Sequence, residues 1–291
     1  MQLVRFDWAI KKLLRNKADY CIVEGLLTVL LGRKITIRHM LESEGNKEAP
    51  DDKFNRVDVL AEDENGALMI FEIQNNRELD YFHRMAYGTS KAITEYLKAG
   101  EPYEKIRKVY SINIVYFSLG QGKDYAYHGT TQFVSMHDKT EILELSEAQK
   151  EAFGCNAPKD IFPEYYLLRV DMFDKIAKTP LDEWISFLKN SEIPSSATAP
   201  GLVEARERLR VEMLDENERR NYDNMMENLR YQKSVIETGR AEGRAEGRVE
   251  GHAEGRAEGI RATAAKMKSM GLGEDVIAVA TGLSAEEIRG L

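Results

Sequence analysis

Alternating apolar and polar residues on both sides of a short turn predict a β-hairpin between residues 55 and 75. The two runs are NRVDVLAE and ALMIFEIQN, and Glu64-Asn65-Gly66 lies between them. The odd positions are apolar on both strands and predict a core face, which is made by Val57, Val59, Ala61, Met69, Phe71 and Ile73. The even positions carry Arg56, Asp58, Glu72 and Gln74.

The length of the turn decides whether two acids on these strands meet. A two-residue loop at Asn65-Gly66 pairs Asp58 with Ile73 and sets a carboxylate opposite the core face. A three-residue loop with a left-handed Gly66 pairs Asp58 with Glu72, and we expect this register because it preserves the apolar pattern. Opposed carboxylates repel unless a proton or cation lies between them. Two interpretations stay open: a Mg²⁺ site, or a solvated strand face on which the acids never converge.

Other periodicities place helices and strands around the hairpin. Apolar pairs predict a helix over residues 19–31, and Glu24 lies beside its apolar stripe, a position that is commonly just the solvent edge of a helix. We expect a polar loop over residues 42–53 and strands at 35–41, 109–119, 125–135, 142–145 and 165–172. This order predicts a mixed sheet flanked by helices.

A long helix is predicted directly after the hairpin and is expected to end near Gly100. Its buried face is predicted from the side chains that recur at helical spacing, which are Leu79, Phe82, Ala86, Thr89, Ile93, Tyr96 and Leu97. Its other face carries Tyr81, Arg84, Tyr87 and Lys91. Such a mixture of cations and aromatic rings suits phosphate groups, although faces of this kind are also commonly only solvated.

Beyond this region the sequence becomes charged and helix-favouring. Residues 181–189 predict a short amphipathic helix with Trp184, Ile185 and Leu188 inward, and residues 191–201 predict a linker. Sparse apolar positions over residues 202–238 predict two helices with a break near Asp215.

A four-residue repeat covers residues 239–259, with Gly, Arg, Ala and Glu in turn. A helix here has no opposite-charge pair at i+3 or i+4, and its six glycines cost roughly 5 kcal/mol relative to alanine, so it should be unstable alone. The segment is either a flexible linker or a helix stabilised by a partner helix that sets its Arg row along this Glu row. We favour helical self-association, because a linker needs no strict period.

The last segment, residues 264–291, resembles a helix-turn-helix in its pattern. Its final helix is predicted to begin at Ser284, with Glu287 completing a capping box. Two acids, Glu286 and Glu287, stand where a recognition helix would approach phosphate. DNA contact and a compact cap or protein-interaction module are both left open.

The composition says more about the cellular environment of the protein than about the reaction it carries out. The 291 residues are 43% hydrophobic and 31% charged with a net charge of -8, so any affinity for nucleic acid must come from local patches. Cys21 and Cys155 are too few for a disulfide framework or a zinc site, and we therefore expect a reducing cytoplasm. No apolar run approaches the ~18 residues of a membrane span, so no membrane association is expected.

The acids of the hairpin carry a resemblance to a known group of enzymes. Asp58, then Glu72-Ile73-Gln74, then a helix with Arg84 and Tyr87, resembles the PD-(D/E)XK nuclease superfamily. More narrowly, FNRVDVLAEDENGALMIFEIQN, YFHRMAYGTSK and RKVYSINIVYF, with LDEWISFLKN and the Gly-rich tail, resemble the bacterial recombination-promoting nuclease and transposase family. This resemblance covers nearly the whole chain.

The resemblance implies an α/β fold with a restriction-endonuclease-like mixed sheet flanked by helices, followed by a helical C-terminal arm and a small helical end. The implied divisions are a nuclease-like core over residues 1–190, a linker and charged helices over 191–238, the repeat over 239–259, and a helix-turn-helix-like segment over 260–291.

Carried over residue by residue, the resemblance makes Asp58 and Glu72 the ligands of Mg²⁺ or Mn²⁺, with Glu24 an acid at a second metal or water. Gln74 stands where the superfamily usually has Lys, although the narrower family itself commonly shows Glu-x-Gln. A Gln can orient a water by hydrogen bonds but cannot stabilise negative charge as a Lys would. We expect Arg84 to supply that positive charge from the neighbouring helix.

The function that the resemblance implies is metal-dependent DNA cleavage linked to recombination or mobile-element processing. The expected catalytic residues are Asp58, Glu72, Gln74, Glu24 and Arg84, and the expected DNA contacts are Tyr81, Tyr87, Lys91, Lys53 and Arg56. We also expect a homo-oligomer formed through the repeat. The competing interpretation is a non-catalytic, nuclease-like assembly protein that binds DNA or another protein, and the acidic balance and the missing Lys favour it.

Overall fold

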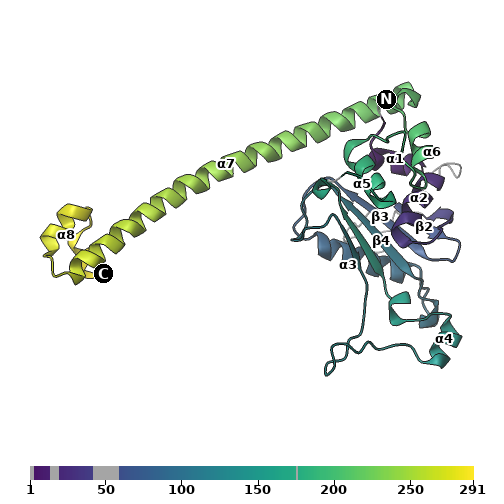
Figure 1. Cartoon of the computed structure of the whole chain (residues 1–291), viewed down its shortest axis with the longest axis horizontal. Helices are drawn as coiled ribbons and strands as arrows, with labels where there is room; N and C mark the ends of the chain where they lie inside the picture. Colours follow the sequence, from purple (N-terminus) through teal and green to yellow (C-terminus); the bar gives the residue numbers. More distant parts are fainter. Residues whose placement is uncertain (1–2, 14–19, 42–58, 175) are drawn as a thin grey trace. The chain divides into compact units, whose positions relative to one another are not determined.

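The computed structural model describes residues 3–13, 20–41, 59–174 and 176–291 (Figure 1). The chain divides into two compact units, Met1–Arg219 and Arg220–Leu291. The first unit is a mixed six-stranded sheet with helices on both faces, and the second is helical. The predicted α/β fold class is confirmed.

The strands follow the order β1-β2-β3-β4-β6-β5 across the sheet. Their bounds are β1 Ile37–Leu41, β2 Val59–Asp63, β3 Leu68–Gln74, β4 Val109–Val115, β5 Ala126–Gly129 and β6 Glu164–Arg169. Strands β3, β4 and β6 are parallel, and the outer pairs are antiparallel. The parallel strands read as nearly continuous apolar runs because both of their faces are covered.

The β2–β3 hairpin has the predicted register. Val59 pairs with Phe71, and the three-residue loop closes with Gly66 at a φ of 81°, a left-handed conformation that glycine adopts without strain. The expected pairing of Asp58 with Glu72 belongs to this same register. Three residues of the predicted site lie outside the described residues: Asp58, Lys53 and Arg56.

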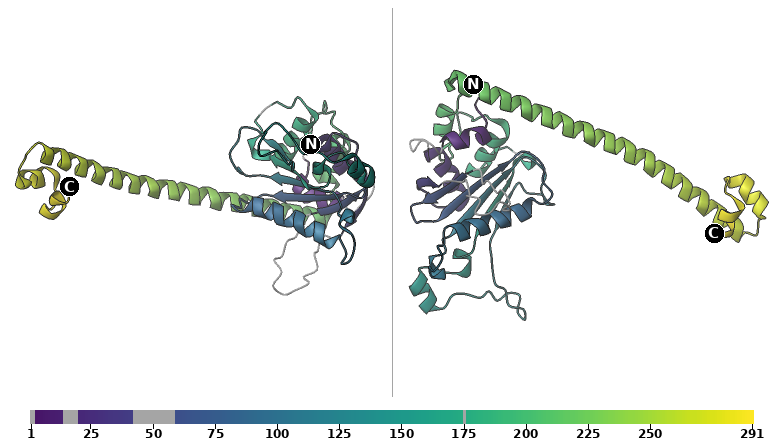
Figure 2. Two further views of the ribbon diagram at one scale, coloured as in Figure 1. Left: turned by 90° about the horizontal axis from the view of Figure 1, so that it is seen from below. Right: turned by 180° about the vertical axis from the view of Figure 1, so that it is seen from behind.

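Both faces of the hairpin are buried, so the solvated strand face, one of the two interpretations left open, does not hold for its described residues. Helix α3 (Tyr81–Glu95) lies along one face of the sheet (Figure 2). This is the face of the even positions, where Leu60, Leu68 and Ile70 pack against Ala92. The apolar odd positions face helices on the other side of the sheet. Glu72 is therefore a buried acid beneath a helix rather than a member of a solvated row.

The buried face predicted for α3 is wrong in part. Thr89 is buried as predicted, but Leu79 and Phe82 are 87% and 52% exposed, and the buried residues also include Tyr81, Met85, Gly88 and Ala92. The helix begins at Tyr81, so Leu79 precedes it, and three small residues make up much of the stripe that meets the sheet. A hydropathy pattern does not mark such small residues as core.

The other face of the sheet is covered by α1 (Phe6–Leu13), α2 (Tyr20–Leu31) and α5 (Pro180–Asn190), with α6 (Leu202–Arg208) beside α2 (Figures 1 and 2). Phe6, Trp184 and Phe187 meet edge to face, with ring centroids 5.9 to 6.2 Å apart. Helix α5 begins with a capping box between Thr179 and Asp182, and its predicted inward residues are buried.

Residues 191–201, which we expected to be a linker, pack against α2 and α5. The Trp184 indole N–H donates to the Pro200 carbonyl at 3.1 Å, and a Cβ built on Gly25 would lie 2.2 Å from that same oxygen. Glycine at position 25 is therefore what allows the segment to lie directly on α2.

The region between β4 and β6 contains less strand than predicted. The run 125–135 forms only β5, and 142–145 forms no strand beyond a single bridge between Val134 and Ile142. Ile142 and Leu143 are 48% and 64% exposed, so their apolar run was not a core signal. Short helical segments complete this unit: α4 Glu147–Phe153, η2 Tyr103–Lys105, η3 Pro158–Asp160, η4 Val170–Met172 and η5 Val211–Met213.

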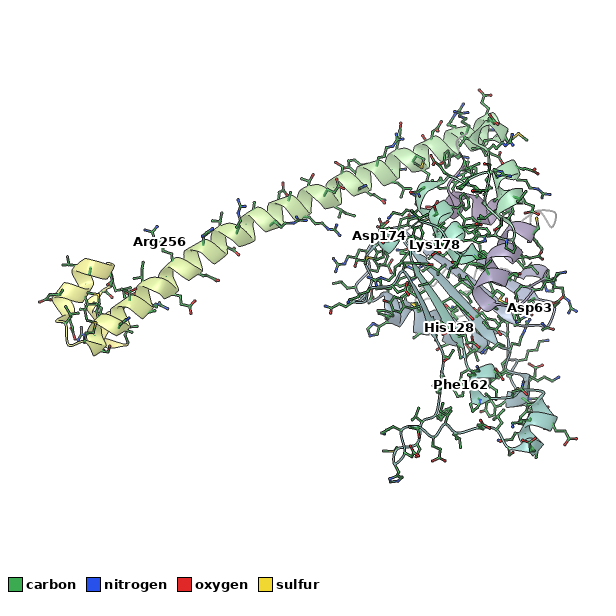
Figure 3. The ribbon with its side chains drawn as sticks, in the orientation of Figure 1. Asp63, His128, Phe162, Asp174, Lys178 and Arg256 are labelled. Carbon is green, nitrogen blue, oxygen red and sulfur yellow. The ribbon has the colours of Figure 1, made fainter. Side chains whose placement is uncertain are left out.

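The C-terminal region is helical throughout. A break over residues 209–215 separates α6 from α7 (Glu216–Ser269), close to the predicted position, and α7 continues through the whole repeat with exposed side chains (Figure 3). Its last turns pack against α8 (Glu274–Thr281) and α9 (Ala285–Arg289) around Ala264, Ile277 and Ile288. Among the described residues, no helix combines the length and apolar character needed to cross a lipid bilayer.

Candidate active site

Glu72 lies near the carboxyl end of β3 and is only 5% exposed. Its in-register neighbour on β4 is Asn113, and both side chains line one cavity beneath α3. A carboxylate in such a position must be compensated by charge or hydrogen bonds, because an unpaired buried charge is very costly.

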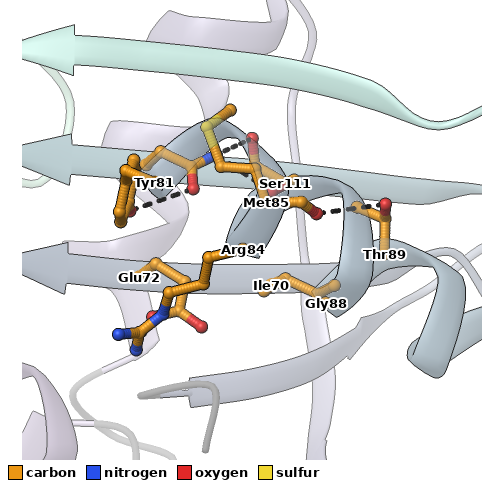
Figure 4. Close-up of a pocket in the computed structure, with 9 residues that line it drawn as sticks. Ile70, Glu72, Tyr81, Arg84, Met85, Gly88, Thr89 and Ser111 are labelled. Atoms are coloured by element: carbon orange, nitrogen blue, oxygen red, sulfur yellow. Dashed lines mark hydrogen bonds and ion pairs between the residues drawn. The ribbon is translucent and has the colours of Figure 1, made fainter. Parts of the chain in front are cut away.

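Arg84 provides that compensation from the first turns of α3. Its Nη2 lies 3.1 Å from Glu72 Oε2, and its Nη1 lies 3.2 Å from Glu78 Oε1 (Figure 4). Burial lowers the pKa of Arg84, but the carboxylates of Glu72 and Glu78 outweigh burial and hold this pKa above its ordinary value. The predicted proximity of Arg84 to the hairpin acid is therefore observed.

Gln74, two residues after Glu72 on the same face of the strand, donates a short hydrogen bond from its amide nitrogen to Glu78 Oε1. Glu78 consequently accepts hydrogen bonds from both Gln74 and Arg84, and these bonds link the end of β3 to the start of α3. Since the Gln74 nitrogen is used in this contact, its amide oxygen is the atom left to face a ligand or water.

A buried polar network supports the site from below. The Tyr81 hydroxyl donates to Asn113 Oδ1 at 3.2 Å, and Asn113 Nδ2 donates to Ser111 Oγ at 2.9 Å. These side chains, together with Glu72 and Arg84, line a cavity of about 10 Å³, which is near the minimum for one water molecule. The network fixes the floor of the site rather than opening a binding pocket.

The end of β3 is also held by the N-terminal segment. Arg5 Nη2 donates to Asn75 Oδ1 at 2.8 Å, and Asn75 Nδ2 donates to Asp7 Oδ2 at 2.9 Å. The Arg5 guanidinium lies over the ring of Tyr116, 4.7 Å from its centroid. These contacts fix the backbone immediately after Gln74.

Two of the predicted DNA-binding side chains on α3 are accessible and one is not. Tyr81 is fully buried and faces the sheet, so its expected place on the outer face of the helix is wrong. Tyr87 is 39% exposed, and Lys91 lies 3.8 Å from Glu95 on the helix surface.

The structure does not bring Glu24 to Glu72. Glu24 Oε1 accepts the backbone N–H of Ile37 at 2.8 Å, at the point where β1 pairs with Asp63 beside the hairpin loop. Asp63 bonds to Ala67 across the hairpin, and Glu72 lies five residues further along the chain, on the order of 15 Å at the usual rise of a strand. Glu24 thus caps the start of β1.

Sequence reasoning missed Glu78, Ser111 and Asn113. Ser111 and Asn113 are polar residues at alternate positions within an otherwise apolar strand, a signal that could have placed both on the face of Glu72. Glu78 offers no comparable signal, because its role follows from how the loop after β3 turns into α3.

The donor set of this site fits a hard divalent cation. Glu72, Glu78 and the amide of Gln74 offer oxygen atoms, the ligands that Mg²⁺ prefers, and neither sulfur nor imidazole is among these side chains. Within the described ranges, no three His, Cys, Asp or Glu side chains gather as a complete metal site.

Comparison with known families decides the relationship of the chain. A family model described as PD-(D/E)XK nuclease family transposase matches residues 4–153, just over half of the chain. The chain belongs to this family. The search of curated proteins gave no match. The search of solved structures gave none either.

Membership in the PD-(D/E)XK nuclease family transposases gives the candidate site its context. It supports a nuclease-like function and implies DNA as a partner, and PD-(D/E)XK nucleases typically use divalent metals. Position 58, the hairpin, Glu72 and most of the supporting network lie within the matched residues.

Proposed function

We propose that the chain is a metal-dependent DNA endonuclease that hydrolyses phosphodiester bonds, in the context of recombination or mobile-element processing. The observation that carries the proposal is the buried, charge-paired Glu72 at the end of β3 in a PD-(D/E)XK family chain, on a hairpin whose described pairs follow the register expected for Asp58 and Glu72. Without that register the two acids of the motif would point to opposite faces of the sheet.

Asp58 and Glu72 would hold the cation, either Mg²⁺ or Mn²⁺. When bound, such an ion polarises the scissile phosphate and lowers the pKa of a bound water. Glu72 suits this role because it is fixed at the end of a central strand, with Asn113 beside it in register.

Arg84 and Gln74 would replace the Lys of the superfamily motif. The Arg84 guanidinium, 3.1 Å from Glu72, is placed to stabilise negative charge that develops on the phosphate. Gln74 would orient the attacking water through its amide oxygen, because Glu78 occupies its nitrogen. Glu78 acts as a positioning residue that holds both side chains.

DNA contacts would come from the exposed side of α3, through Tyr87 and Lys91, and from Lys53 and Arg56 before β2. Tyr81 is excluded from direct contact because it is fully buried. Glu24 is excluded from the cation site because its carboxylate caps Ile37.

A plasmid-nicking assay tests the proposal. Purified full-length protein is expected to convert supercoiled plasmid to nicked or linear DNA in Mg²⁺ or Mn²⁺, and EDTA is expected to abolish the conversion. DNA that is bound but never cut in either metal would reject the enzyme and support the assembly protein.

The alternative function rests on one specific contact. Arg84 neutralises Glu72, and a guanidinium at 3.1 Å competes with a cation for the same carboxylate. A non-catalytic protein with a nuclease-like core would keep such an ion pair permanently. The same nicking assay separates the two functions, since only the endonuclease breaks phosphodiester bonds.

The repeat of α7 would associate two or more copies of the chain. All six of its glycines have open space where a Cβ would stand, and its side chains are exposed. At about 100° per residue, the Glu row lies to one side of the Gly row and the Arg row lies to the other. Two parallel helices facing each other over glycine therefore set Glu beside Arg, whereas antiparallel helices set Glu beside Glu.

A further inference from the structure

Arg169 is a buried cation at the same end of the sheet as Glu72. It is the last residue of β6, it is 2% exposed, and the register runs from Gln74 to Val115 to Arg169 across three parallel strands. Two strand spacings place the Cα atoms of Gln74 and Arg169 about 10 Å apart. Leu167 and Val115 pack against α3, so the side chain of Arg169 starts from the face that carries Glu72.

The charge of Arg169 has no carboxylate partner among the described residues. Its Nη1 donates to the carbonyl oxygens of Gly122 at 3.2 Å and Asp124 at 3.3 Å, and the guanidinium lies 5.8 Å from the ring centroid of Tyr127. Its Nε is buried without a hydrogen-bond partner. A buried guanidinium balanced only by carbonyl dipoles leaves a net positive charge, which an anion at the surface above it would stabilise.

Arg169 and Tyr127 together fix the loop of residues 118–124 that follows β4. The Asp124 N–H donates to the Tyr127 hydroxyl at 3.1 Å, and a Cβ built on Gly122 would lie only 2.1 Å from that hydroxyl oxygen. The loop is largely exposed and carries Lys123 between the two carbonyls that Arg169 holds. It is a polar, glycine-containing loop of one defined shape at the carboxyl end of the parallel strands.

The same loop lies beside α3. A Cβ on Gly120 would lie 3.7 Å from the ring of Phe82, which is 52% exposed on the outer side of the helix. The loop therefore continues the surface of α3 that would face DNA, and Glu72 lies beneath that helix.

We propose that the loop of residues 118–124 forms a subsite for a backbone phosphate of the DNA strand beside the cleavage site, with Lys123 as the contacting side chain and Arg169 as the buried positive charge beneath it that fixes the loop. This inference rests on the proposed function. Arginine and lysine are the residues that recognise phosphate, and a separation of about 10 Å corresponds to about three nucleotides of duplex rise. Contacts of this kind fix the position of the strand and carry no base sequence.

Binding of a short fluorescein-labelled DNA duplex tests the subsite without cleavage when all proteins carry Glu72→Gln. Lys123→Gln is compared with Lys98→Gln, an exposed lysine beyond the end of α3. Lys123→Gln is expected to weaken binding about three- to ten-fold at moderate salt and to reduce the slope of log Kd against log salt by about one, with Lys98→Gln unchanged.

Equal affinities and salt slopes for Lys123→Gln and Lys98→Gln would overturn the subsite while leaving DNA binding intact. Absence of duplex binding by the Glu72→Gln parent would overturn the proposed function as well. Arg169→Gln, checked for folding by circular dichroism, is expected to weaken binding more than Lys123→Gln does. A folded Arg169→Gln protein with parental affinity would remove Arg169 from the subsite. If that variant does not fold, the comparison of Lys123→Gln with Lys98→Gln alone decides whether the subsite exists.

Discussion

The guanidinium of Arg84 lies between the carboxylates of Glu72 and Glu78 and balances both. Arg84→Met is expected to lower the free energy of unfolding by roughly 1–3 kcal/mol, because Glu72 would remain buried without its partner. Arg84→Lys should lose less stability, since a lysine keeps the charge but not the two-sided geometry. Urea unfolding followed by tryptophan fluorescence measures both variants.

The same pair of variants separates the two functions of Arg84. If Arg84 stabilises the reacting phosphate, nicking activity should fall at least ten-fold in Arg84→Met and partly recover in Arg84→Lys. A folded Arg84→Met protein with parental nicking activity would show that the ion pair is only structural.

At this scale the sequence predicted a good part of the site. The pairing of Arg84 with the hairpin acid Glu72 could be predicted because the helix that carries Arg84 directly follows the hairpin in the sequence. Asn113 and Glu78 could not be placed in the same way, because their roles depend on strand neighbours and on a loop conformation. Glu24 was misplaced because a helix period gives the face of a residue but not which strand that face meets.

Among the elements, β4, β5 and β6 are linked by an ionic cluster at the sheet end opposite the site. Glu164 accepts hydrogen bonds from His128 at 2.8 Å and pairs with Lys108 at 2.9 Å. Burial raises the pKa of Glu164, but hydrogen bonds from Lys108 and His128 outweigh burial and hold this pKa below its ordinary value of 4.5.

This cluster makes stability depend on pH in a defined direction. Because the folded-state pKa is lowered, the stabilisation is fully present above about pH 4.5 and is lost as the pH falls through the folded value. Glu164→Gln should cost roughly 1 kcal/mol at pH 7 and progressively less below pH 4. Urea unfolding at a series of pH values checks this, with the exposed Glu151→Gln as control. A difference independent of pH would contradict the assignment.

The sequence predicted which helices and strands form better than it predicted which of their faces are covered. The hairpin turn was specified locally by Gly66, so the register followed from the sequence. Which faces are covered was not local information: α3 buries small residues such as Gly88, and residues 191–201 lie on α2 through Gly25. Exposed apolar residues such as Leu143 misled the strand prediction, because hydrophobicity does not report burial by itself.

At the scale of the whole molecule, α7 includes a segment, residues 239–259, whose own sequence disfavours a helix. Its repeat has six glycines, and the side chains of the repeat are exposed. The full chain is expected to sediment as a dimer or larger, and deletion of residues 239–259 should yield a monomer. A monomeric parent, or an unchanged oligomer after deletion, would reject association through the repeat.

The orientation of the associated helices can be measured separately. In a parallel pair, Gly243→Cys should form a disulfide with its own copy, giving a dimer on a non-reducing gel. In an antiparallel pair centred on the repeat, Gly243→Cys alone should not cross-link to its own copy, and a mixture of Gly243→Cys and Gly255→Cys chains should form the disulfide instead. The parent chain, with Cys21 and Cys155, serves as control.

The most direct measurement of the central claim is the nicking rate of Glu72→Gln against its parent. The substitution preserves the size of the buried side chain and removes the charge that would hold a cation and that pairs with Arg84. In Mg²⁺, the nicking rate is expected to fall at least a hundred-fold, with unchanged DNA affinity in EDTA. A folded Glu72→Gln protein that cuts plasmid at the parental rate would contradict the assignment of the active site.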